Sequence, residues 1–202
     1  MNLIIRQENA ADYDAVETLT REAFWDIYQP GCDEHLLAHK LRKETAFIPE
    51  LDFVAELDGR LVGNIMYSKA IITDETGTDH EVITFGPLSV LPLHQRSGIG
   101  SALIKHTMKL AEELGYKAVV IFGNPAYYHR FGFANAAKFH ISTGDGENFE
   151  AFMVKELVAG ALHKITGRYQ ECPAFQIDKA EVAAFDQKFP YKEKHTTQTQ
   201  FR

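Results

Sequence analysis

The first quarter of the chain shows one strand-like and two helical patterns of apolar residues. The apolar run Leu3-Ile4-Ile5 predicts a strand, and Asn9, with Asp12 three residues later, stands where a helix needs an N-terminal cap. The apolar positions that follow at helical spacing are Val16, Leu19 and Ala23. After a Pro-Gly break, Leu37 and Leu41 lie four residues apart. This part of the chain is therefore predicted as strand, helix, helix.

Two apolar segments around an Asp-Gly pair predict a β-hairpin. Residues 53–57 and 61–67 flank Asp58-Gly59-Arg60, and an Asp-Gly pair readily adopts the positive φ angles of a tight turn. A polar, turn-rich stretch then leads into a predicted strand over residues 82–91. Pro87 lies inside that strand and cannot donate a ladder hydrogen bond, so we expect a bulge or a strand edge that has parted from its neighbour.

A glycine turn at residues 95–100 follows that strand and precedes a predicted helix over residues 98–114. The apolar residues that fall largely on one face of this helix are Ile99, Leu103, Leu110 and Leu114. Gly115 suits the position just after the helix, and the continuous apolar run 118–122 predicts a strand covered on both faces. Strand, turn, helix and strand make a βαβ unit, whose two strands should be parallel.

The pattern is weaker beyond Phe133. Residues 151–154 predict a strand and residues 178–185 a short helix, while the polar stretch 192–202 is expected to be frayed.

Composition and charge exclude several classes of function. A chain of 202 residues with 45% hydrophobic and 24% charged residues can bury one substantial core. A net charge of −7 without a cluster of Lys and Arg argues against nucleic acid as a partner. With no apolar signal segment or membrane-spanning run, we expect no membrane partner and a cytoplasmic location. Cys32 and Cys172 match no CxxC spacing, so we expect reduced thiols.

The segment Gln95-Arg96-Ser97-Gly98-Ile99-Gly100 combines the features of an anion site. It joins a strand end to a helix start, where backbone N–H groups and the positive helix end converge. Gly98 and Gly100 let the backbone approach a ligand closely, and Arg96 can bind phosphate oxygens. The glycines alone are equally typical of a tight turn without a ligand. No Lys-Ser/Thr pair follows a GxxxxG spacing and no third small residue follows the GxG, which disfavours a nucleotide triphosphatase or a Rossmann dehydrogenase.

The stretch from Val90 to Leu103 resembles the acetyl-CoA signature Q/R-x-x-G-x-G/A of the GNAT family of N-acetyltransferases. Ile5-Arg6, Asp12, Val16 and Leu19 look like the first strand and helix of that family, and residues 127–133 look like its F-Y-x-x-x-G-F segment. The resemblance implies an α/β fold with a mixed, mostly antiparallel central sheet, a splayed parallel strand pair and flanking helices. It implies an acetyl-CoA-binding core over residues 1–135, with residues 136–202 as the C-terminal part of the same domain plus an extension.

The resemblance also implies acetyl-CoA as co-substrate and a small-molecule or peptide amine as acceptor. Backbone groups of Leu88 and Val90 are expected to pair with the pantetheine arm, and an N–H of Ser89 or Val90 to hold the oxyanion of the tetrahedral intermediate. The predicted cofactor-binding residues are Leu88, Ser89, Val90, Gln95, Arg96, Ser97, Gly98, Ile99, Gly100, Ser101 and Asn124. Asn124 departs from the family pattern, because the run between it and the tyrosine is shortened.

Tyr128 is the candidate acid for the departing thiolate. A tyrosine phenol, with an ordinary pKa of about 10, can still protonate a thiolate that forms beside it. The alternative is that Tyr127 and Tyr128 are both core aromatics. Glu22, Asp26 and Glu81 could act as bases through water, although each also fits a solvated surface carboxylate.

No metal site is predicted. His35 and His39 lie four residues apart, but no third ligand pattern such as HExxH accompanies them, so we expect an ordinary helix surface. Cys172 is expected to be a structural thiol. The absence of an identifiable base leaves a non-catalytic acyl-CoA sensor as an alternative, and residues 136–202 could bind a partner. The sequence also leaves a homodimer open.

Overall fold

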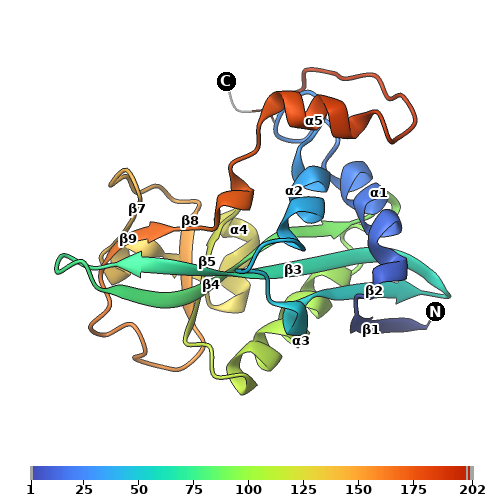
Figure 1. Ribbon diagram of the computed structural model, residues 1–202. Helices are drawn as coiled ribbons and strands as arrows, with labels where there is room; N and C mark the ends of the chain where they lie inside the picture. The colour runs from blue at the N-terminus through green and yellow to red at the C-terminus, as the bar shows by residue number, and fades with distance from the viewer. Residues whose placement is uncertain (1, 199, 201–202) are drawn as a thin grey trace. The chain divides into compact units, whose positions relative to one another are not determined.

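The computed structural model describes residues 2–198 and 200, which form an α/β fold around a mixed sheet (Figure 1). The strands are β1 (Leu3–Gln7), β2 (Phe53–Leu57), β3 (Arg60–Thr73), β4 (Asp79–Val90), β5 (Ala118–Phe122), β6 (Ala134–Asn135), β7 (Ile141–Thr143), β8 (Phe152–Glu156) and β9 (Gly167–Gln170). The α-helices are α1 (Tyr13–Phe24), α2 (Glu34–Leu41), α3 (Ile99–Glu113), α4 (Pro125–Tyr128) and α5 (Lys179–Asp186).

The sheet is mostly antiparallel. Its strand order is β1-β2-β3-β4-β5-β8-β6, and β9 pairs with β3 and β7. The pairs β4–β5 and β7–β9 are parallel, whereas β1–β2, β2–β3, β3–β9, β5–β8 and β6–β8 are antiparallel. This confirms the predicted fold class. The parallel pairing of β4 and β5 joins Ile83 to Val119, as expected for the βαβ unit.

The chain divides into two compact units. Unit 1 comprises Met1–Met66, Gly86–Ile104 and Pro173–Arg202, and unit 2 comprises Tyr67–Phe85 and Lys105–Cys172. β3, β4 and α3 contribute residues to both. Among the described residues, no helix combines the length and the apolar character needed to cross a bilayer.

The predicted cap at the start of the first helix is confirmed. Asn9 Oδ1 accepts a hydrogen bond from Ala11 N at 2.9 Å, and Asp12 Oδ2 accepts one from Asn9 N at 3.0 Å, which makes a capping box. The first turn is a 3₁₀ turn before α1 proper begins at Tyr13. Asp12 Oδ2 also forms an ion pair with Arg6 Nη1 of β1 at 2.7 Å, so the cap links α1 to the edge strand of the sheet.

The hairpin around the Asp-Gly pair is also confirmed. Asp58 and Gly59 have φ angles of 49° and 83°, and β2 pairs antiparallel with β3 from Leu57↔Arg60 onward. β3 continues to Thr73, further than predicted.

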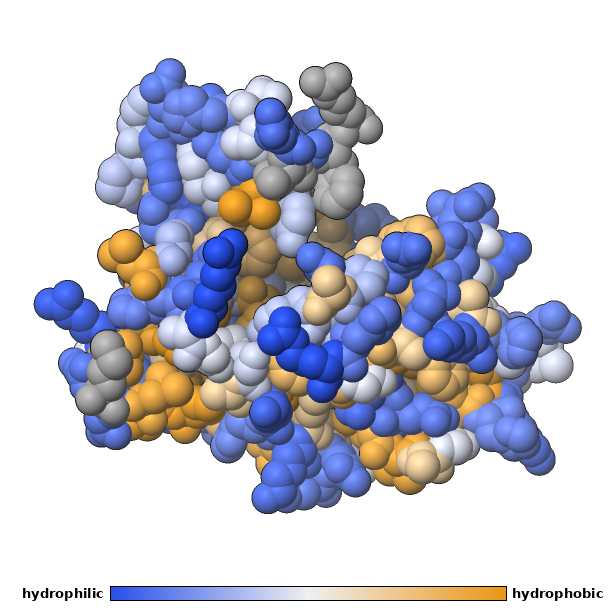
Figure 2. Space-filling view, turned by 180° about the vertical axis from the view of Figure 1, so that it is seen from behind, coloured by the Kyte–Doolittle hydropathy of each residue, from blue (hydrophilic) through white to orange (hydrophobic). Residues whose placement is uncertain are grey.

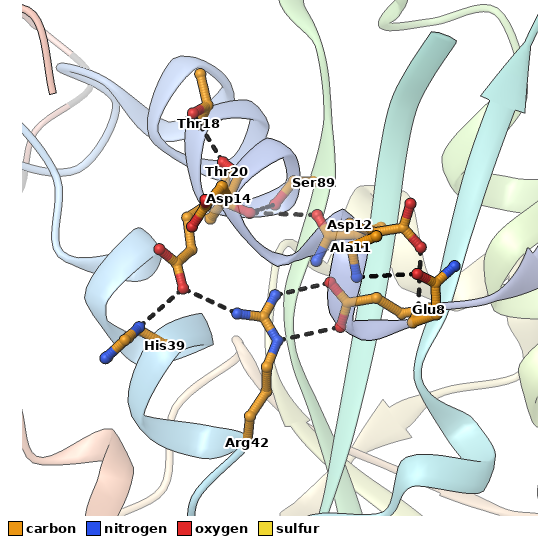
Figure 3. Close-up of polar contacts among 12 residues, drawn as sticks. Glu8, Ala11, Asp12, Asp14, Thr18, Thr20, His39, Arg42 and Ser89 are labelled. Carbon is orange, nitrogen blue, oxygen red and sulfur yellow. Dashed lines mark hydrogen bonds and ion pairs between the residues drawn. The ribbon is translucent and has the colours of Figure 1, made fainter. Parts of the chain in front are cut away.

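In unit 1, α1, α2 and α5 lie side by side (Figure 1). Arg42 at the end of α2 donates hydrogen bonds to both carboxylate oxygens of Glu8, at 2.7 and 3.1 Å, and to Glu17 of α1 at 3.0 Å (Figure 3). All three side chains are at least nine-tenths buried, so the charges are paired where water does not reach them.

The expectation that both histidines of α2 lie on an ordinary helix surface is wrong for His35. Its side chain is fully buried, with ring centroids 5.4 Å from Phe185 and 5.3 Å from Phe189. Helix α5 and the residues after it cover this face of α2, which the pattern of α2 alone does not reveal. His39 is half-buried and contacts Glu17 at 2.9 Å.

The polar end of the chain, predicted as frayed, contacts α1 over its described part. Lys192 Nζ lies 2.7 Å from Glu22, and Trp25 Nε1 donates to the carbonyl of Glu193 at 2.9 Å. Residues 199, 201 and 202 lie outside the described residues.

Helix α3 has the predicted start and stop, but its buried face differs from the prediction. Gly115, with a φ of 88°, donates to the Glu112 carbonyl at 2.9 Å and ends the helix. The buried residues of α3 are Ile99, Leu103, Ile104, Thr107, Met108 and Ala111. Leu114 is 47% exposed, because the helix has turned its predicted apolar stripe away from the sheet by its last turn.

The core of unit 2 includes residues of β3, β4, β5, β7, β8 and β9. Its largest fully buried members are Phe152, Ile72 and Ile141, and Tyr169 of β9 lies among them. The predicted strand at residues 151–154 is confirmed as β8, whereas β9 was not predicted.

The face of the molecule seen in Figure 2 is mostly hydrophilic, with separate hydrophobic areas between the charged residues.

Candidate active site

The loop before α3 holds its backbone in a conformation suited to an anion. Arg96 and Gly98 both have positive φ angles, of 61° and 92°. A Cβ atom added to Gly98 would meet no atom within 4 Å, so the space in front of this residue is open. Ser97 Oγ donates to the His94 carbonyl at 2.5 Å, and Gln95 Nε2 donates to the Val90 carbonyl at 3.1 Å. The polar side chains of the loop thus fix its shape.

The loop leads directly into the N-terminus of α3. Ala102 N donates to the Gly98 carbonyl at 2.9 Å, which makes Gly98 the residue that begins the helical hydrogen bonds. Backbone N–H groups in the first turn of a helix have no carbonyl of that helix to bond, and the helix dipole makes this end positive. The exposed Arg96 adds a full positive charge. The segment therefore has backbone N–H groups and positive charge of the kind that binds phosphate.

The end of β4 is fixed from two sides within unit 1. Ser89 Oγ donates to Thr20 Oγ1 of α1 at 3.1 Å, and Thr20 Oγ1 donates to Asn64 Oδ1 of β3 at 3.2 Å (Figure 3). All three residues are buried. Gly63 has no room for a side chain, because a Cβ atom would lie 3.0 Å from the Ser89 carbonyl oxygen and 3.2 Å from Ile99 Cγ2. The backbone between Leu88 and Val90 is thus held firmly.

Tyr128 closes the short helix α4 in unit 2. Asn124 caps this helix, because its side-chain oxygen accepts from Ala126 N at 3.0 Å. That cap gives Asn124 a structural role beside the cofactor contact predicted for it. The Tyr128 ring lies against Gly123 at the end of β5, where an added Cβ would be only 2.3 Å from Tyr128 Cε2. Sequence reasoning missed Gly123, although its place directly after a buried strand was a usable signal.

An aromatic cluster surrounds the half-buried Tyr128 ring. The ring centroids of Phe85, Phe133 and Tyr127 lie 5.9, 5.7 and 5.0 Å from it. Tyr128 is therefore partly a packing residue, as the core-aromatic alternative holds. Its ring is also oriented by that packing, as a proton donor must be.

The three carboxylates considered as bases all have other partners. Glu22 pairs with Lys192 at 2.7 Å, and Glu81 pairs with Lys69 at 3.0 Å. Burial raises the pKa of Asp26, but hydrogen bonds from Gly31 N and from His195 outweigh it and hold the pKa below its usual range. A carboxylate whose pKa is held low, as that of Asp26 is, is a poor proton acceptor near neutral pH.

Glu171, which follows β9, is a carboxylate that the sequence did not point to. It is half-buried, and burial raises the pKa of its carboxyl to about 7. No ion pair reaches it from the residues that the structure describes. Nothing in the local sequence marked it, since its environment comes from distant strands.

Metal and thiol chemistry find no support in the described part of the chain. No group of three or more His, Cys, Asp or Glu side chains there could hold a metal ion. Cys32 is buried, with Sγ 3.6 Å from the Arg21 carbonyl, and burial raises the pKa of its thiol well above the usual range. Cys172 is buried as well, and neither cysteine forms a disulfide.

The structure thus places the predicted residues in two groups. Unit 1 brings together Leu88, Ser89, Val90, Gln95, Arg96, Ser97, Gly98, Ile99, Gly100 and Ser101. Unit 2 brings together Asn124 and Tyr128.

Known proteins with similar sequences and structures are acetyltransferases. Residues 50–135 match the family model described as "Acetyltransferase (GNAT) domain". The chain is 32% identical over 166 residues to the "Uncharacterized N-acetyltransferase YhbS" of Escherichia coli K12, which covers 82% of this chain and 93% of the relative.

Two solved structures share the fold. One is the GNAT family N-acetyltransferase YhbS from Escherichia coli in complex with CoA, with 29% identity, a TM-score of 0.77 and coverage of 87% of this chain and 92% of that one. The other is a GNAT family acetyltransferase from Brucella melitensis in complex with acetyl-CoA, with 27% identity, a TM-score of 0.69 and coverage of 86% and 98%.

Proposed function

Because the chain belongs to the GNAT family and is an acetyl-CoA-dependent N-acetyltransferase, we propose that it acts by direct attack of a primary amine on acetyl-CoA. In this proposal the loop before α3 binds the pyrophosphate, the end of β4 binds the pantetheine arm, and Tyr128 protonates the departing thiolate. The observation that carries the proposal is the open loop with positive φ at Arg96 and Gly98, set at the N-terminus of the 15-residue helix α3.

The residues present fit acetyl-CoA. Its diphosphate carries negative charge, which the positive helix end and Arg96 favour, and the open space before Gly98 admits its oxygens. Bound acetyl-CoA supplies an activated thioester. The proposed cofactor-binding residues are Leu88, Ser89, Val90, Gln95, Arg96, Ser97, Gly98, Ile99, Gly100 and Ser101. Asn124 stays on this list only through its amide nitrogen, because its oxygen caps α4.

Each residue of this chain has a limited task. The fixed backbone of Leu88 and Val90 orients the pantetheine arm, and the N–H of Ser89 or Val90 donates to the carbonyl oxygen as negative charge develops on it. The Tyr128 hydroxyl gives its proton to the thiolate sulfur. No side chain forms a covalent bond to the acetyl group.

An amine panel tests this function. Isotopically labelled acetyl-CoA, incubated with pooled amines, should give labelled amide that mass spectrometry identifies. Tyr128→Phe should lower kcat on the order of 10² to 10³-fold while the dissociation constant for CoA, measured by calorimetry, stays the same. A Tyr128→Phe enzyme with unchanged kcat would show that another group is the acid.

Arg96→Ala is the complementary variant. It should weaken CoA binding roughly 10-fold and leave kcat at saturating acetyl-CoA nearly unchanged, because Arg96 contributes to binding alone. Tight CoA binding by the wild type without turnover of any amine would instead favour the acyl-CoA sensor.

The finer expectations from sequence stay predictions. They are a cytoplasmic location, an acceptor that is a small-molecule or peptide amine and not a nucleic acid, and a possible role of residues 136–202 in binding a partner. Cell fractionation would test the location, and the amine panel would test the acceptor. The oligomeric state in solution would show whether the protein is a homodimer.

A further inference from the structure

Four polar side chains gather on one face of the sheet in unit 2. They are Ser68 of β3, Thr84 of β4, Tyr169 of β9 and Glu171 just after β9. Strand geometry places them together. Ile72 of β3 lies directly opposite Tyr169, so the two side chains share a face, and both belong to the core of unit 2.

Side chains alternate between the two faces along a strand, and this alternation puts Ser68, Glu171 and Thr84 on the face of Tyr169. Ser68 shares the face of Ile72, and Glu171 shares the face of Tyr169. Extending the β3–β9 register by one residue sets Glu171 opposite Ala70, with Ser68 as its diagonal neighbour.

Thr84 reaches the same face from β4. It lies two residues after Val82, another member of the core of unit 2, so the two side chains share a face. Burial raises the pKa of the Tyr169 phenol, and the nearby Thr84 hydroxyl opposes this rise. Three strands thus direct polar groups toward Glu171.

Two hydroxyls of this cluster are buried without a partner. Ser68 is fully buried and Tyr169 is 3% exposed, yet neither Ser68 Oγ nor Tyr169 Oη has a partner at hydrogen-bonding geometry among the described residues. A buried hydroxyl without a partner costs about 1–3 kcal/mol, so native proteins rarely keep one without a use. Both hydroxyls are placed to bind water or a polar ligand beside Glu171.

Two exposed aromatic rings lie at one edge of the cluster. The Tyr169 ring lies 6.0 Å from that of Phe122, at the end of β5, and Phe122 is 45% exposed. Phe122 stacks on Phe149, which is 48% exposed. These rings form an apolar surface next to the buried polar groups.

Strand β4 relates this cluster to the proposed acid. Thr84 and Phe85 are neighbours in an extended strand, so their side chains point to opposite faces. The Phe85 ring contacts Tyr128, with centroids 5.9 Å apart, whereas Thr84 lies beside Tyr169. Tyr128 and Glu171 therefore flank the same stretch of β4 from its two sides. An amine attacks a carbonyl on one side while the thiolate departs, so an acid and a base on opposite sides suit the reaction.

We propose that Glu171 is the general base of the acetyl transfer, and that the Ser68 and Tyr169 hydroxyls hold the water that carries the amine proton to it. The N–H bond of the ammonium breaks, the proton reaches the Glu171 carboxylate, and the electron pair stays on nitrogen. The nitrogen then bonds to the acetyl carbon, the carbon–sulfur bond breaks, and the sulfur takes the proton of the Tyr128 hydroxyl. The second proton of the nitrogen passes through water to the Tyr128 phenolate, which leaves the neutral amide, and Glu171 returns its proton to solvent. This inference rests on the proposed function.

Burial, and no neighbouring charge, sets the pKa of Glu171 near neutral pH. Its pKa of about 7 has burial as its cause, and Tyr169 and Cys172 are the titratable groups on its own segment. On β3 and β4, Lys69 pairs with Glu81 at 3.0 Å, and Lys69 alternates to the other face from Ser68. Arg168 of β9 alternates to that face as well.

The test is the pH dependence of kcat in the full chain, with the panel amine that gives the highest rate at saturating acetyl-CoA. Wild-type kcat should fall on the acid side with an apparent pKa near 7. Glu171→Gln should lower kcat on the order of 10²-fold at pH 7.5 and abolish this acid limb. Glu171→Asp should keep the limb and lose roughly 10-fold or less, because the carboxylate remains.

Glu150→Gln is the matched control, since Glu150 is an exposed carboxylate of the same unit and takes no part in the proposed site, and its profile should match the wild type. CoA affinity, measured by calorimetry, should be unchanged in every variant. A Glu171→Gln enzyme that turns over within about twofold of wild type and keeps the acid limb would overturn the inference and leave the proposed function intact. A wild type that binds CoA but acetylates no amine would overturn both.

A readout independent of activity uses ¹³C labelling of glutamate carboxyls. Burial raises the pKa of both Glu34 and Glu171 to about 7, so two resonances should titrate near pH 7. One of the two should disappear in Glu171→Gln, and both should persist in Glu150→Gln. If every glutamate resonance instead titrated near the ordinary pKa of about 4.3, Glu171 would not be poised as a base.

Discussion

At the scale of single residues, the position of Tyr128 depends on the missing side chain of Gly123. An added Cβ would lie 2.3 Å from Tyr128 Cε2 and 2.6 Å from Cδ2, far inside van der Waals contact. We predict that Gly123→Ala moves the ring and lowers kcat to nearly the level of Tyr128→Phe, because an error of about 1 Å in placing a reacting group costs on the order of 10²-fold. Steady-state kinetics measure this effect.

Gly144→Ala is the matched control, because its added Cβ would lie 3.5 Å from the Tyr169 carbonyl oxygen, an ordinary contact. Its kcat should stay at the wild-type value. If Gly123→Ala kept full activity, the Tyr128 ring would have room to shift without loss, and its packing would be irrelevant to catalysis.

A second prediction at this scale concerns the buried hydroxyl chain from Ser89 through Thr20 to Asn64. Thr20→Val keeps the shape but removes the acceptor of Ser89 Oγ and the donor to Asn64 Oδ1. We expect a loss of about 1–3 kcal/mol in the free energy of unfolding, because buried polar atoms lose their partners. Urea denaturation measures it, and kcat should fall as well, since Ser89 belongs to the segment that we propose holds the carbonyl oxygen.

Thr18→Val provides the comparison on the same helix. The Thr18 hydroxyl is exposed and bonds only the Asp14 carbonyl of its own helix, so this change should stay within about 0.5 kcal/mol. Equal losses in the free energy of unfolding for the two variants would mean that the hydrogen bonds linking Ser89, Thr20 and Asn64 add nothing to stability.

The proposed phosphate loop could be predicted from the sequence and the proposed base could not, for a physical reason. The loop from Gln95 to Gly100 is a local structure, whose glycines and helix start are adjacent in the chain. Glu171 acquires its environment from Ser68, Thr84 and Tyr169, which lie on three separate strands. No local pattern encodes such a convergence, whereas the burial of Glu171 becomes visible as soon as the strands are paired.

At the scale of secondary structure elements, the capping box of α1 is a local feature with a measurable effect. Asn9→Ala removes the side-chain oxygen that accepts from Ala11 N. We predict a loss of about 1 kcal/mol in the free energy of unfolding, measured by urea denaturation. Asn9→Ser should retain most of the stability, because serine caps helices about as well as asparagine. Equal losses for alanine and serine would contradict a capping role.

Elements with a strong local signal were predicted, and elements that depend on distant partners were not. The Asp58-Gly59 turn and the Gly115 stop encode their own backbone conformation, so β2, β3 and the end of α3 follow from sequence. β9 has four residues, and its pairing with β3 and β7 makes it a strand. Its sequence, Gly167-Arg168-Tyr169-Gln170, carries little alternation of its own.

At the scale of the whole molecule, the last residues of the chain determine the environment of helices more than a hundred residues away. Asp186 pairs with Arg21 of α1 at 2.7 Å and lies 3.4 Å from His35 of α2, and both partners are buried. By itself, α2 has the composition of a surface helix. Only the contact between the two segments, remote in sequence, buries His35.

That burial makes the stability of the protein depend on pH. Burial first, and Arg21 in addition, lower the pKa of His35 from 6.5 to about 4, although Asp186 and Asp33 act in the opposite direction. The unfolded chain therefore binds a proton below pH 6.5 that the folded protein refuses until about pH 4. The contribution of the neutral imidazole to stability is complete above pH 6.5 and is lost as the pH falls through this window.

We predict that His35→Leu flattens the fall of the unfolding free energy between pH 7 and pH 4 by up to about 3 kcal/mol, the equivalent of the pKa difference. The leucine keeps an apolar side chain between Phe185 and Phe189, so the variant should remain folded for urea titrations at each pH. His163→Leu, at an exposed position of unit 2, should keep the wild-type slope. A His35→Leu protein with the wild-type slope would mean that His35 binds its proton equally well in the folded and unfolded states, which a fully buried imidazole beside Arg21 should not do.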